Sequence, residues 1–454
     1  MHRIVVVGAG PAGIRAAETL WRNGLRPILL EEGRGSGGQG YRQPSEGLDL
    51  DIAKLMGSEA RKYRRLHEDF AQMVPSIDYR PETLVWGAGK GTLHTLRDGV
   101  AELIDYDAVI VATGAMDRIM PLPGWTLPGV FTLGGAQVAM KDQGCLIGKR
   151  VVFCGSSPLL PLAALQYKML GAEVVAICDT TSMRDKISAG PKLLASPKTF
   201  VRGLTYLRQL RAEGIETLFG ADPVRIVGEE SVEALVVSDR QGRERRFSCD
   251  AVALGYGLKP ETQLAELLGA TFAFDPSFRL WLPKADEDGR AAPGLYLAGD
   301  GARIGGADAA EDSGRLAAHA LLDDLGITSD RGENRRLRGR VKRLRRFQNG
   351  LSKAFSWPVR FAGRLGDDVT ICRCENVKAG EIRSAMDTDL GPVEINRVKA
   401  ITRCGMGRCQ GRVCGPALQE LIAAHAGLPI VEVGRLRGQA PVKPIPVSAA
   451  RRQS

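Results

Sequence analysis

The feature that most constrains the fold is a glycine-rich turn near the N-terminus, Gly8-Ala9-Gly10-Pro11-Ala12-Gly13. It lies between a short apolar strand (3–7) and a helical stretch that runs to about residue 23. Gly8 permits a tight turn, Gly10 lets a pyrophosphate approach the backbone, and Gly13 allows the helix to pack closely on the strand. The phosphates of a dinucleotide would then lie on the N-terminus of the helix.

An acidic pair closes the next strand (27–30), about 20 residues after the turn. Glu31 and Glu32 stand where a carboxylate accepts hydrogen bonds from the adenosine ribose, and Glu31 fits this register better. The complete pattern of strand, glycine turn, helix, strand and acid predicts a Rossmann-like unit that binds a dinucleotide. A glycine turn in an empty Rossmann-like unit is the alternative.

Three further segments favour FAD as this dinucleotide. The first is Gly37-Gly38-Gln39; the second is a strand ending in Ala112-Thr113-Gly114; the third is a strand ending in Gly299-Asp300, whose carboxylate can bind a ribityl hydroxyl. Each alone is compatible with a buried strand and a glycine turn, but their order and spacing resemble the flavoproteins with two dinucleotide-binding domains. The expected cofactor-binding residues are Gly8, Gly10, Pro11, Ala12, Gly13, Glu31, Glu32, Gly38, Gln39, Val85, Ala112, Thr113, Gly114, Gly299 and Asp300.

A second Rossmann-like pattern occupies residues 149–179, with the turn Gly155-Ser156-Ser157-Pro158-Leu159-Leu160-Pro161. Only Gly155 stands at a glycine position of the fingerprint, because Ser157 and Leu160 take the second and third places. Side chains at these places would crowd a pyrophosphate. We therefore expect a degenerate domain that does not use NAD(P)H, and the sequence leaves open whether it binds any nucleotide.

Five of the nine cysteines lie close together near the C-terminus, with the spacing of thiolate ligands: Cys372, Cys374, Cys404, Cys409 and Cys414. Four thiolates can hold a [2Fe-2S] cluster or a zinc ion. Glycines at 405, 407, 411 and 415 favour the cluster because they let backbone N–H groups approach the sulfurs, and nearby arginines could offset its negative charge. A helix from Pro416 to Ala426 would add a positive N-terminus. The spacing alone does not identify the spare cysteine.

The other cysteines and the histidines show no catalytic arrangement. Cys145, Cys154, Cys178 and Cys249 are isolated, so we expect small buried core residues and no redox disulfide. The five histidines are dispersed and provide no visible general base. The catalytic residues are therefore unknown from the sequence.

The net charge of +10 is concentrated in two segments, a connector around 331–364 and the C-terminal tail. Leu337, Val341, Leu344 and Leu351 predict an amphipathic helix over 335–351. Its basic face is compatible with solvent, with a partner subunit, or with nucleic acid or a membrane, but no nucleic-acid motif accompanies it and we expect no such partner. No apolar run reaches the ~18 residues of a transmembrane span. The early first strand leaves no room for a signal peptide, so we expect a cytoplasmic protein.

The cysteine segment closely resembles a known domain. Cys372-x-Cys374-Glu375 and Thr402-Arg403-x-Gly405-Met406-Gly407-x-Cys409-Gln410-Gly411-Arg412-x-Cys414 are similar to the [2Fe-2S] domain related to bacterioferritin-associated ferredoxin. With Gly37-Gly38-Gln39 and the segment 123–130, the resemblance narrows to the large (alpha) subunit of heteromeric opine oxidases, D-hydroxyproline and dye-linked proline dehydrogenases and hydrogen cyanide synthase. It covers nearly the whole chain.

This resemblance implies an α/β fold with two dinucleotide-binding domains and a small [2Fe-2S] domain. We expect an FAD-binding domain (1–118 and 250–325), an inserted Rossmann-like domain (119–249), a basic connector (326–367), the [2Fe-2S] domain (368–430) and a basic tail (431–454). The cluster ligands carry over to Cys372, Cys374, Cys409 and Cys414, which leaves Cys404 as the spare.

The same resemblance implies an electron-transfer subunit of a hetero-oligomeric dehydrogenase. A separate FAD-containing, amine-oxidase-like beta subunit would oxidise a secondary-amine amino acid. Relatives can also hold an FMN at the subunit interface and a small additional subunit. Two alternatives stay open: a stand-alone NAD(P)H-dependent reductase that reduces its own cluster, and a flavoprotein whose C-terminal zinc domain only docks a partner.

Overall fold

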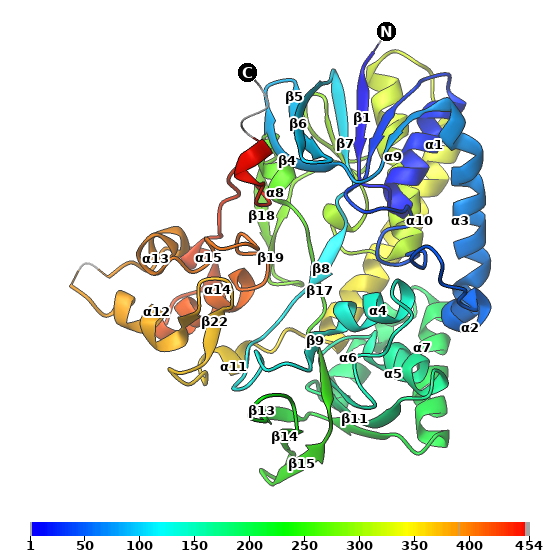
Figure 1. Ribbon diagram of the computed structural model, residues 1–454. Helices are drawn as coiled ribbons and strands as arrows, with labels where there is room; N and C mark the ends of the chain where they lie inside the picture. Colours follow the sequence, from blue (N-terminus) through cyan, green and yellow to red (C-terminus); the bar gives the residue numbers. More distant parts are fainter. Residues whose placement is uncertain (1, 390, 450–454) are drawn as a thin grey trace.

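The computed structural model describes residues 2–389 and 391–449. Two α/β domains lie one above the other, and a small cysteine-rich domain packs against one side of both (Figure 1). The architecture is therefore α/β with a separate C-terminal domain, as the sequence predicts.

The N-terminal domain is built on a six-stranded sheet in the order β20-β21-β7-β1-β2-β3, parallel except for β20. Its helices cover one face and a three-stranded antiparallel sheet covers the other. Since both faces are covered, the central strands are continuous apolar runs. The strands of the main sheet are β1 (Ile4–Val7), β2 (Ile28–Leu30), β3 (Asp78–Arg80), β7 (Ala108–Val111), β20 (Arg290–Ala292) and β21 (Leu295–Leu297). The covering elements are α1 (Pro11–Arg22), α3 (Ala60–Met73), α9 (Ala307–Asp324), β4 (Leu84–Gly89), β5 (Thr92–Arg97) and β6 (Val100–Asp105).

The second domain repeats this plan around a five-stranded parallel sheet in the order β12-β11-β10-β16-β9. It confirms the second Rossmann-like unit expected from residues 149–179. The sheet consists of β9 (Val130–Thr132), β10 (Arg150–Gly155), β11 (Glu173–Asp179), β12 (Glu216–Phe219) and β16 (Ala251–Gly255). It lies between α4 (Leu133–Lys141), α5 (Leu160–Met169) and α7 (Pro197–Ala212) on one face and β13 (Asp222–Val227), β14 (Ala234–Ser238) and β15 (Glu244–Ser248) on the other.

Two antiparallel strands, β8 (Ala115–Asp117) and β17 (Leu258–Pro260), connect the two large domains. After β17 the chain re-enters the N-terminal domain through a short helix, α8 (Gln263–Leu267), and the hairpin of β18 (Phe272–Asp275) and β19 (Leu280–Pro283). The chain therefore crosses twice between the domains, so the flavin motif after β7 and the residues after β17 lie side by side.

The basic connector forms one long helix, α10 (Arg331–Ala354), which packs against α9 and α6 (Met183–Leu193). Gly339 does not interrupt it. Leu337 and Val341 are buried as predicted, while Phe347 provides the next buried position and Leu344 and Leu351 are only half-buried. Several arginines pair with acids of the same chain: Arg338 with Asp288 and Arg340 with Asp312. Part of the basic face is therefore used internally.

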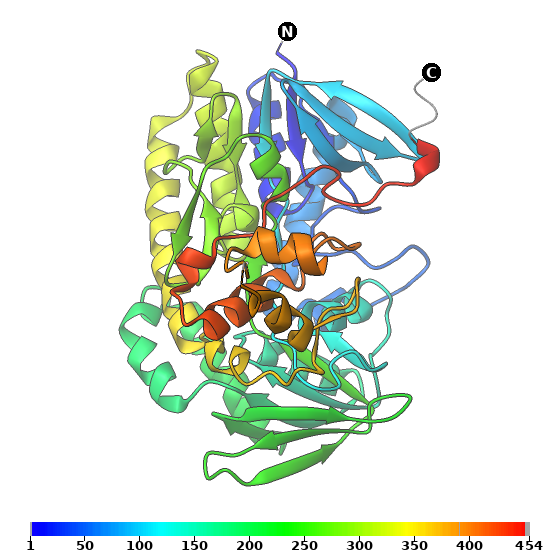
Figure 2. The same ribbon diagram turned by 90° about the vertical axis from the view of Figure 1, so that its left-hand side faces the viewer.

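The cysteine-rich domain surrounds a small apolar core that continues into the second domain through Trp125, Trp357 and Phe361. Its elements are α11 (Val359–Ala362), β22 (Thr370–Cys372), β23 (Val377–Lys378), α12 (Ala379–Met386), α13 (Ile395–Thr402), α14 (Gly415–Ala426) and α15 (Ile430–Val433). From α15 the tail returns across the N-terminal domain toward β4 (Figure 2), where the Val442 N–H donates to the Trp86 carbonyl at 2.8 Å.

One expectation about the isolated cysteines is wrong. Cys154, Cys178 and Cys249 are buried as predicted, but Cys145 is exposed, because it follows α4 in a loop outside the core. Among the residues that the structure describes, no helix combines the length and the apolar composition needed to cross a bilayer.

Candidate functional site

The glycine turn after β1 forms a cradle at the N-terminus of α1. A Cβ on Gly13 would lie 1.7 Å from the Gly8 carbonyl oxygen, so packing alone demands glycine there. A Cβ on Gly10 would meet nothing closer than the Gly38 Cα at 3.7 Å. No side chain caps the N-terminus of α1, in which Ala12 is the second residue. The first backbone N–H groups therefore remain available for an anion such as the FAD pyrophosphate.

The side chains of Glu31 and Glu32 point in different directions at the end of β2. Glu31 is half-buried, and its carboxylate accepts hydrogen bonds from the Ala9 N–H at 2.7 Å and the Gly33 N–H at 2.8 Å. Burial raises the pKa of Glu31. Glu32 is exposed and pairs with Lys443 of the C-terminal tail. Glu31 thus stays beside the cradle, where a ribose hydroxyl would need an acceptor.

The Gly-Asp motif lies against the same cradle. A Cβ on Gly299 would be 2.7 Å from the Ala12 Cβ, which places the turn after β21 on the start of α1. Asp300 accepts hydrogen bonds from the Gly305 and Gly306 N–H groups at 2.7 and 3.0 Å through one carboxylate oxygen. Burial raises the pKa of Asp300. The other oxygen remains as an acceptor for a ribityl hydroxyl.

The Ala112-Thr113-Gly114 segment lies beside the Gly-Asp motif. A Cβ on Gly301 would lie 2.8 Å from the Thr113 Oγ1 and 3.0 Å from the Gly114 N, so this segment and the Gly-Asp motif are in contact. Ala112 is buried at the end of the preceding strand. The structure therefore brings the glycine turn, the Ala-Thr-Gly segment and the Gly-Asp motif together, as an FAD site requires.

Two of the expected cofactor residues lie differently. Val85 is buried in the apolar core between β4 and the main sheet, and Gln39 is exposed on the loop after Gly38. The side chain of Val85 packs against protein, so this residue could reach a cofactor only through its backbone.

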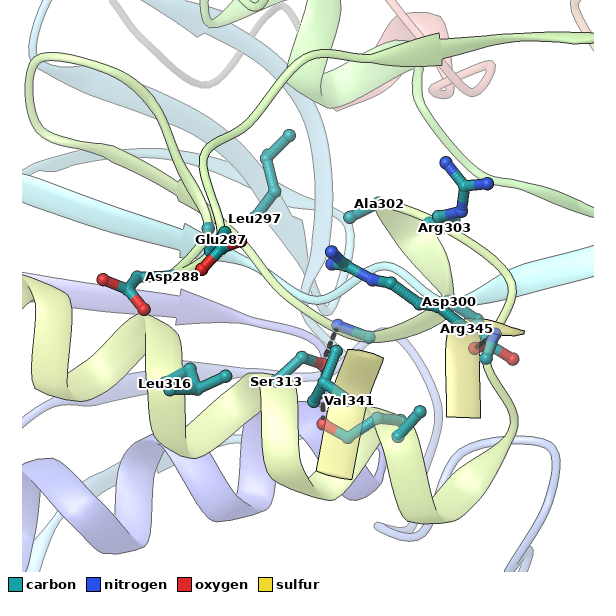
Figure 3. Close-up of a pocket in the computed structure, with 15 residues that line it drawn as sticks. Glu287, Asp288, Leu297, Asp300, Ala302, Arg303, Ser313, Leu316, Val341 and Arg345 are labelled. Atoms are coloured by element: carbon teal, nitrogen blue, oxygen red, sulfur yellow. Dashed lines mark hydrogen bonds between the residues drawn. The ribbon is translucent and has the colours of Figure 1, made fainter. Parts of the chain in front are cut away.

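A small cavity lies behind the Gly-Asp motif (Figure 3). Its volume is about 30 Å³, and Arg345 of α10 and Ser313 of α9 contribute to its wall. The Ser313 hydroxyl accepts a hydrogen bond from the Gly299 N–H at 2.8 Å and donates to the Ala310 carbonyl. A space of this size holds one or two water molecules, whereas ligand pockets measure roughly 300–1,000 Å³. This cavity is therefore too small to hold a substrate.

The nucleotide position of the second domain is filled by the chain's own side chains. Asp179 ends β11 where a ribose-binding acid would stand, but it pairs with Lys186 at 2.7 Å and accepts from Thr181. The Lys186 ammonium also lies 3.6 Å from the ring centroid of Phe355, just after α10. At the turn itself, the Ser157 hydroxyl accepts from the Leu159 N–H, and Leu160 is buried. Both the acid and the turn are thus occupied by intrachain contacts.

The five C-terminal cysteines converge at one place. Cys372 ends β22 and Cys374 lies in the following turn; Cys404 follows α13; Cys409 and Cys414 belong to the loop before α14. The sulfurs of Cys372, Cys404 and Cys414 all lie within 4.8 Å of one another, and these three residues are buried. Cys374 is exposed and Cys409 half-buried. The structure therefore places the cysteine expected to be spare among the inner thiols.

The pKa is lowered at two of the five cysteines, Cys372 and Cys409, whereas burial raises the pKa of Cys374 and the shared thiol hydrogen bonds raise the pKa of Cys404 and Cys414. Hydrogen bonds from the Cys404 and Cys414 thiols, followed by the backbone N–H groups of Gly405 and Glu375, lower the pKa of Cys372 to about 2. At Cys409, the Cys414 thiol and the N–H groups of Val413 and Gly411 lower the pKa to about 5. Backbone groups from the glycine-rich loop thus approach the sulfurs as the sequence predicts. The helix α14 begins directly after Cys414, one residue earlier than expected.

The cysteine loop docks on the flavin motif through Glu261, the first residue after β17. The Glu261 backbone accepts from the Thr113 hydroxyl at 2.7 Å, and its N–H donates to the Gly114 carbonyl at 2.9 Å. Its carboxylate binds Arg412 at 2.5 and 3.3 Å. Arg412 lies between Cys409 and Cys414 in the sequence. Glu261 therefore contacts both the flavin motif and the cysteine loop.

Other docking residues carry no motif in the sequence and were not predicted. Gln263 donates to the Gln410 carbonyl at 2.7 Å, and Arg279 pairs with the buried Glu420 at 2.8 Å. Leu436 of the tail covers the cysteine loop, since a Cβ on Gly411 would lie 2.6 Å from its Cδ1. Lys259 is half-buried near Cys414 and Arg412, and desolvation lowers its pKa. Arg412 was expected only to offset the negative charge of the cluster. Its pairing with Glu261 was not predictable from the sequence.

Two family descriptions match this chain. Residues 2–318 match the pyridine nucleotide-disulphide oxidoreductase family, and residues 370–424 match the BFD-like [2Fe-2S] binding domain. The chain accordingly binds FAD and a [2Fe-2S] cluster.

The relatives agree over almost the full length. An opine oxidase subunit of Agrobacterium tumefaciens (strain Ach5) is 34% identical over 98% of this chain and 90% of that protein. Hydrogen cyanide synthase subunit HcnB of Pseudomonas protegens is 33% identical over 98% of this chain and 96% of that protein. The crystal structure of L-proline dehydrogenase from P. horikoshii shares the fold, with a TM-score of 0.71 and 21% identity over 99% of this chain and 79% of that chain.

These matches agree with the geometry of both sites and identify an oxidoreductase subunit. The chain belongs to the family of FAD- and [2Fe-2S]-containing oxidoreductase subunits that includes this opine oxidase subunit and hydrogen cyanide synthase subunit HcnB.

Proposed function

We propose that this chain is the electron-relay subunit of a heteromeric dehydrogenase or oxidase acting on a secondary-amine amino acid of the opine, hydroxyproline or proline type. In this proposal a separate FAD-containing, amine-oxidase-like beta subunit oxidises the substrate. Two relatives, one from opine oxidase and one from hydrogen cyanide synthase, are both named as subunits, which supports a multi-subunit assembly.

The observation that carries the proposal is the contact of the flavin motif with the cysteine loop. When bound, FAD exchanges one or two electrons and a [2Fe-2S] cluster exchanges one. Glu261 holds Thr113 and Gly114 through its backbone and Arg412 through its carboxylate. Because the Glu261–Arg412 pair is largely buried, its geometry is fixed and both cofactor sites are held at one distance.

The closed nucleotide position of the second domain supports an electron source other than NAD(P)H. Asp179 is already neutralised by Lys186, so a ribose would have to displace a buried ion pair. Breaking such a pair costs several kcal/mol, about 3–5 by the usual magnitude. Electrons from a partner subunit require no such displacement.

The proposed cluster ligands are Cys372, Cys374, Cys409 and Cys414, all of which lie in the converging thiol group. The ribose and ribityl contacts of Glu31 and Asp300 are part of the same proposal. An FMN at the interface with the beta subunit, a small additional subunit and a cytoplasmic location remain predictions.

The test is anaerobic absorption spectroscopy of the full-length chain with both cofactors bound. We expect NADH and NADPH to leave the flavin band near its oxidised intensity, whereas dithionite bleaches it. After the beta subunit is added, a substrate such as an opine or proline should bleach both the flavin and the cluster. Dithionite serves as the control that both centres can be reduced.

Stoichiometric bleaching by NADH or NADPH alone would overturn the proposal in favour of a stand-alone reductase. Reduction of the flavin by the amino acid without any partner would place substrate oxidation on this chain and would equally contradict it.

A further inference from the structure

The cysteine that the proposed ligand set omits lies among the inner thiols. Cys372, Cys404 and Cys414 have their sulfurs within 4.8 Å of one another, and none is more than 2% exposed. Two thiolates bound to one tetrahedral metal at ~2.3 Å lie roughly 3.8 Å apart. Any two of the three sulfurs therefore stand near the separation that two ligands of one iron adopt.

The other two cysteines, Cys374 and Cys409, lie toward the outside of the loop and are called the outer pair. Cys374 is exposed and Cys409 half-buried, and neither belongs to the group of three sulfurs that lie within 4.8 Å of one another. A Cβ on Gly407 would lie 2.2 Å from the Cys374 Cβ, so the loop presses directly on this pair. Since each iron of a [2Fe-2S] cluster takes two thiolates, the outer iron has two cysteines for two places and the inner iron has three.

Cys404 is held in place by the end of α13. Arg403 adopts the left-handed conformation, with φ of 62°, and reverses the chain. The Cys404 N–H then donates to the Thr402 hydroxyl, which itself donates to the Val398 carbonyl at 2.7 Å. The Cys404 side chain is 0% exposed. This thiol is consequently fixed beside the cluster site and is not a free surface cysteine.

We propose that Cys404 is a reserve ligand of the inner iron, able to replace either Cys372 or Cys414. In such an exchange the Cys404 thiol would lose its proton and bind the iron, the bond between the iron and the Cys372 or Cys414 sulfur would break, and the released thiolate would take up a proton. No electron is transferred and the number of thiolate ligands stays at four. The inference rests on the proposed ligand set, to which it adds a fifth participant.

The test uses full-length alanine variants, reconstituted anaerobically with iron and sulfide. We expect C372A, C414A and C404A each to retain about two irons per chain, because two inner thiols remain. The double variants C372A/C404A and C414A/C404A should lose the cluster, and so should C374A and C409A, because the outer pair has no reserve. The readouts are iron and sulfide content, visible absorption, and the electron paramagnetic resonance spectrum after reduction. A changed spectrum in C372A would report the exchanged ligand.

FAD content and far-ultraviolet circular dichroism are measured for every variant as controls of folding. Loss of the cluster in C372A or C414A with helix content retained would overturn the reserve ligand while leaving the four-cysteine set intact. If C372A loses helix content, C372V repeats the test with a side chain that fills the site. Retention of the cluster in C409A, or zinc in place of iron in the unmodified chain, would instead overturn the ligand set itself.

Discussion

Gly10 and Gly13 show how two glycines of one motif serve different purposes. Gly13 has no room for a Cβ even in the absence of a ligand, because the Gly8 carbonyl lies against it. Gly10 has room within the protein, since its nearest neighbour is the Gly38 Cα at 3.7 Å. The requirement for glycine at position 10 therefore comes from the cofactor, and the requirement at position 13 comes from packing of helix on strand.

The Gly10→Ala variant should separate folding from cofactor binding. We expect it to fold with unchanged helix content but to bind FAD at least tenfold more weakly, because the added methyl group projects where the pyrophosphate would lie on the helix N-terminus. Affinity is measured by flavin fluorescence during titration of the apoprotein.

Gly339→Ala in α10 provides the matched control. It also adds one methyl group in open space, but far from the cradle, and it should leave FAD affinity unchanged while stabilising the helix by about 0.5–1 kcal/mol. Equal FAD affinity in both variants would contradict the assigned role of Gly10.

At the scale of elements, the packing of α10 on α9 places a carboxylate in a nearly dry position. Asp312 of α9 is 0% exposed and lies between Arg315 at 3.5 Å and Arg340 at 3.0 Å. Burial outweighs the attraction of both arginines and raises the pKa of Asp312 to about 6. Because the folded chain keeps this proton at pH values where the unfolded chain has released it, Asp312 favours folding at low pH and loses that contribution as pH rises from about 4 to 6.

Asp312→Asn should remove this pH dependence. We expect the free energy of unfolding of the unmodified chain, relative to that of the variant, to decrease by up to ~3 kcal/mol between pH 4 and pH 7. The measurement is the apparent melting temperature of both proteins across this range at equal cofactor content. Parallel pH profiles would show that Asp312 titrates normally in the folded protein.

At the scale of the whole molecule, the C-terminal tail fastens the cysteine-rich domain to the flavin domain. Glu266 of α8 accepts two hydrogen bonds from Arg435 at 2.6 and 2.8 Å and one from the Gly438 N–H at 2.7 Å. Between these anchors Leu436 covers Gly405, Gly411 and Gly415. The tail thus links the cysteine-rich domain to the flavin domain and also covers the cluster site.

Glu266→Ala should make the cluster labile without affecting FAD. Removing one partner of this largely buried pair costs about 3 kcal/mol, enough to release the tail locally and expose the cysteine loop to water and oxygen. We expect cluster absorbance to decay several-fold faster in air, at unchanged flavin content.

Glu216→Ala is the control for the loss of a tail anchor, because it breaks an exposed ion pair with Arg245 in the second domain and should change the decay little. Identical decay rates for the two variants would show that the tail does not protect the cluster.

The sequence by itself determined both cofactor domains. Short-range patterns carried that information: the fingerprint from Gly8 to Gly13 predicts strand, turn and helix, and the spacing of the five C-terminal cysteines predicts a thiolate site within one domain. The degenerate turn at Ser157 and Leu160 was equally visible, because the required glycines are adjacent in sequence.

Only the tertiary structure decided how the sites are connected. The pairing of Glu261 with Arg412 spans 151 residues, the closing of the second nucleotide position by Lys186 depends on where α10 ends, and Cys404 joined the inner thiols because α13 reverses at Arg403. None of these contacts has a local signature, since each depends on the packing of elements that are distant in the chain. Sequence patterns identified the groups that could bind a cofactor. Long-range packing determined which of these groups contact one another.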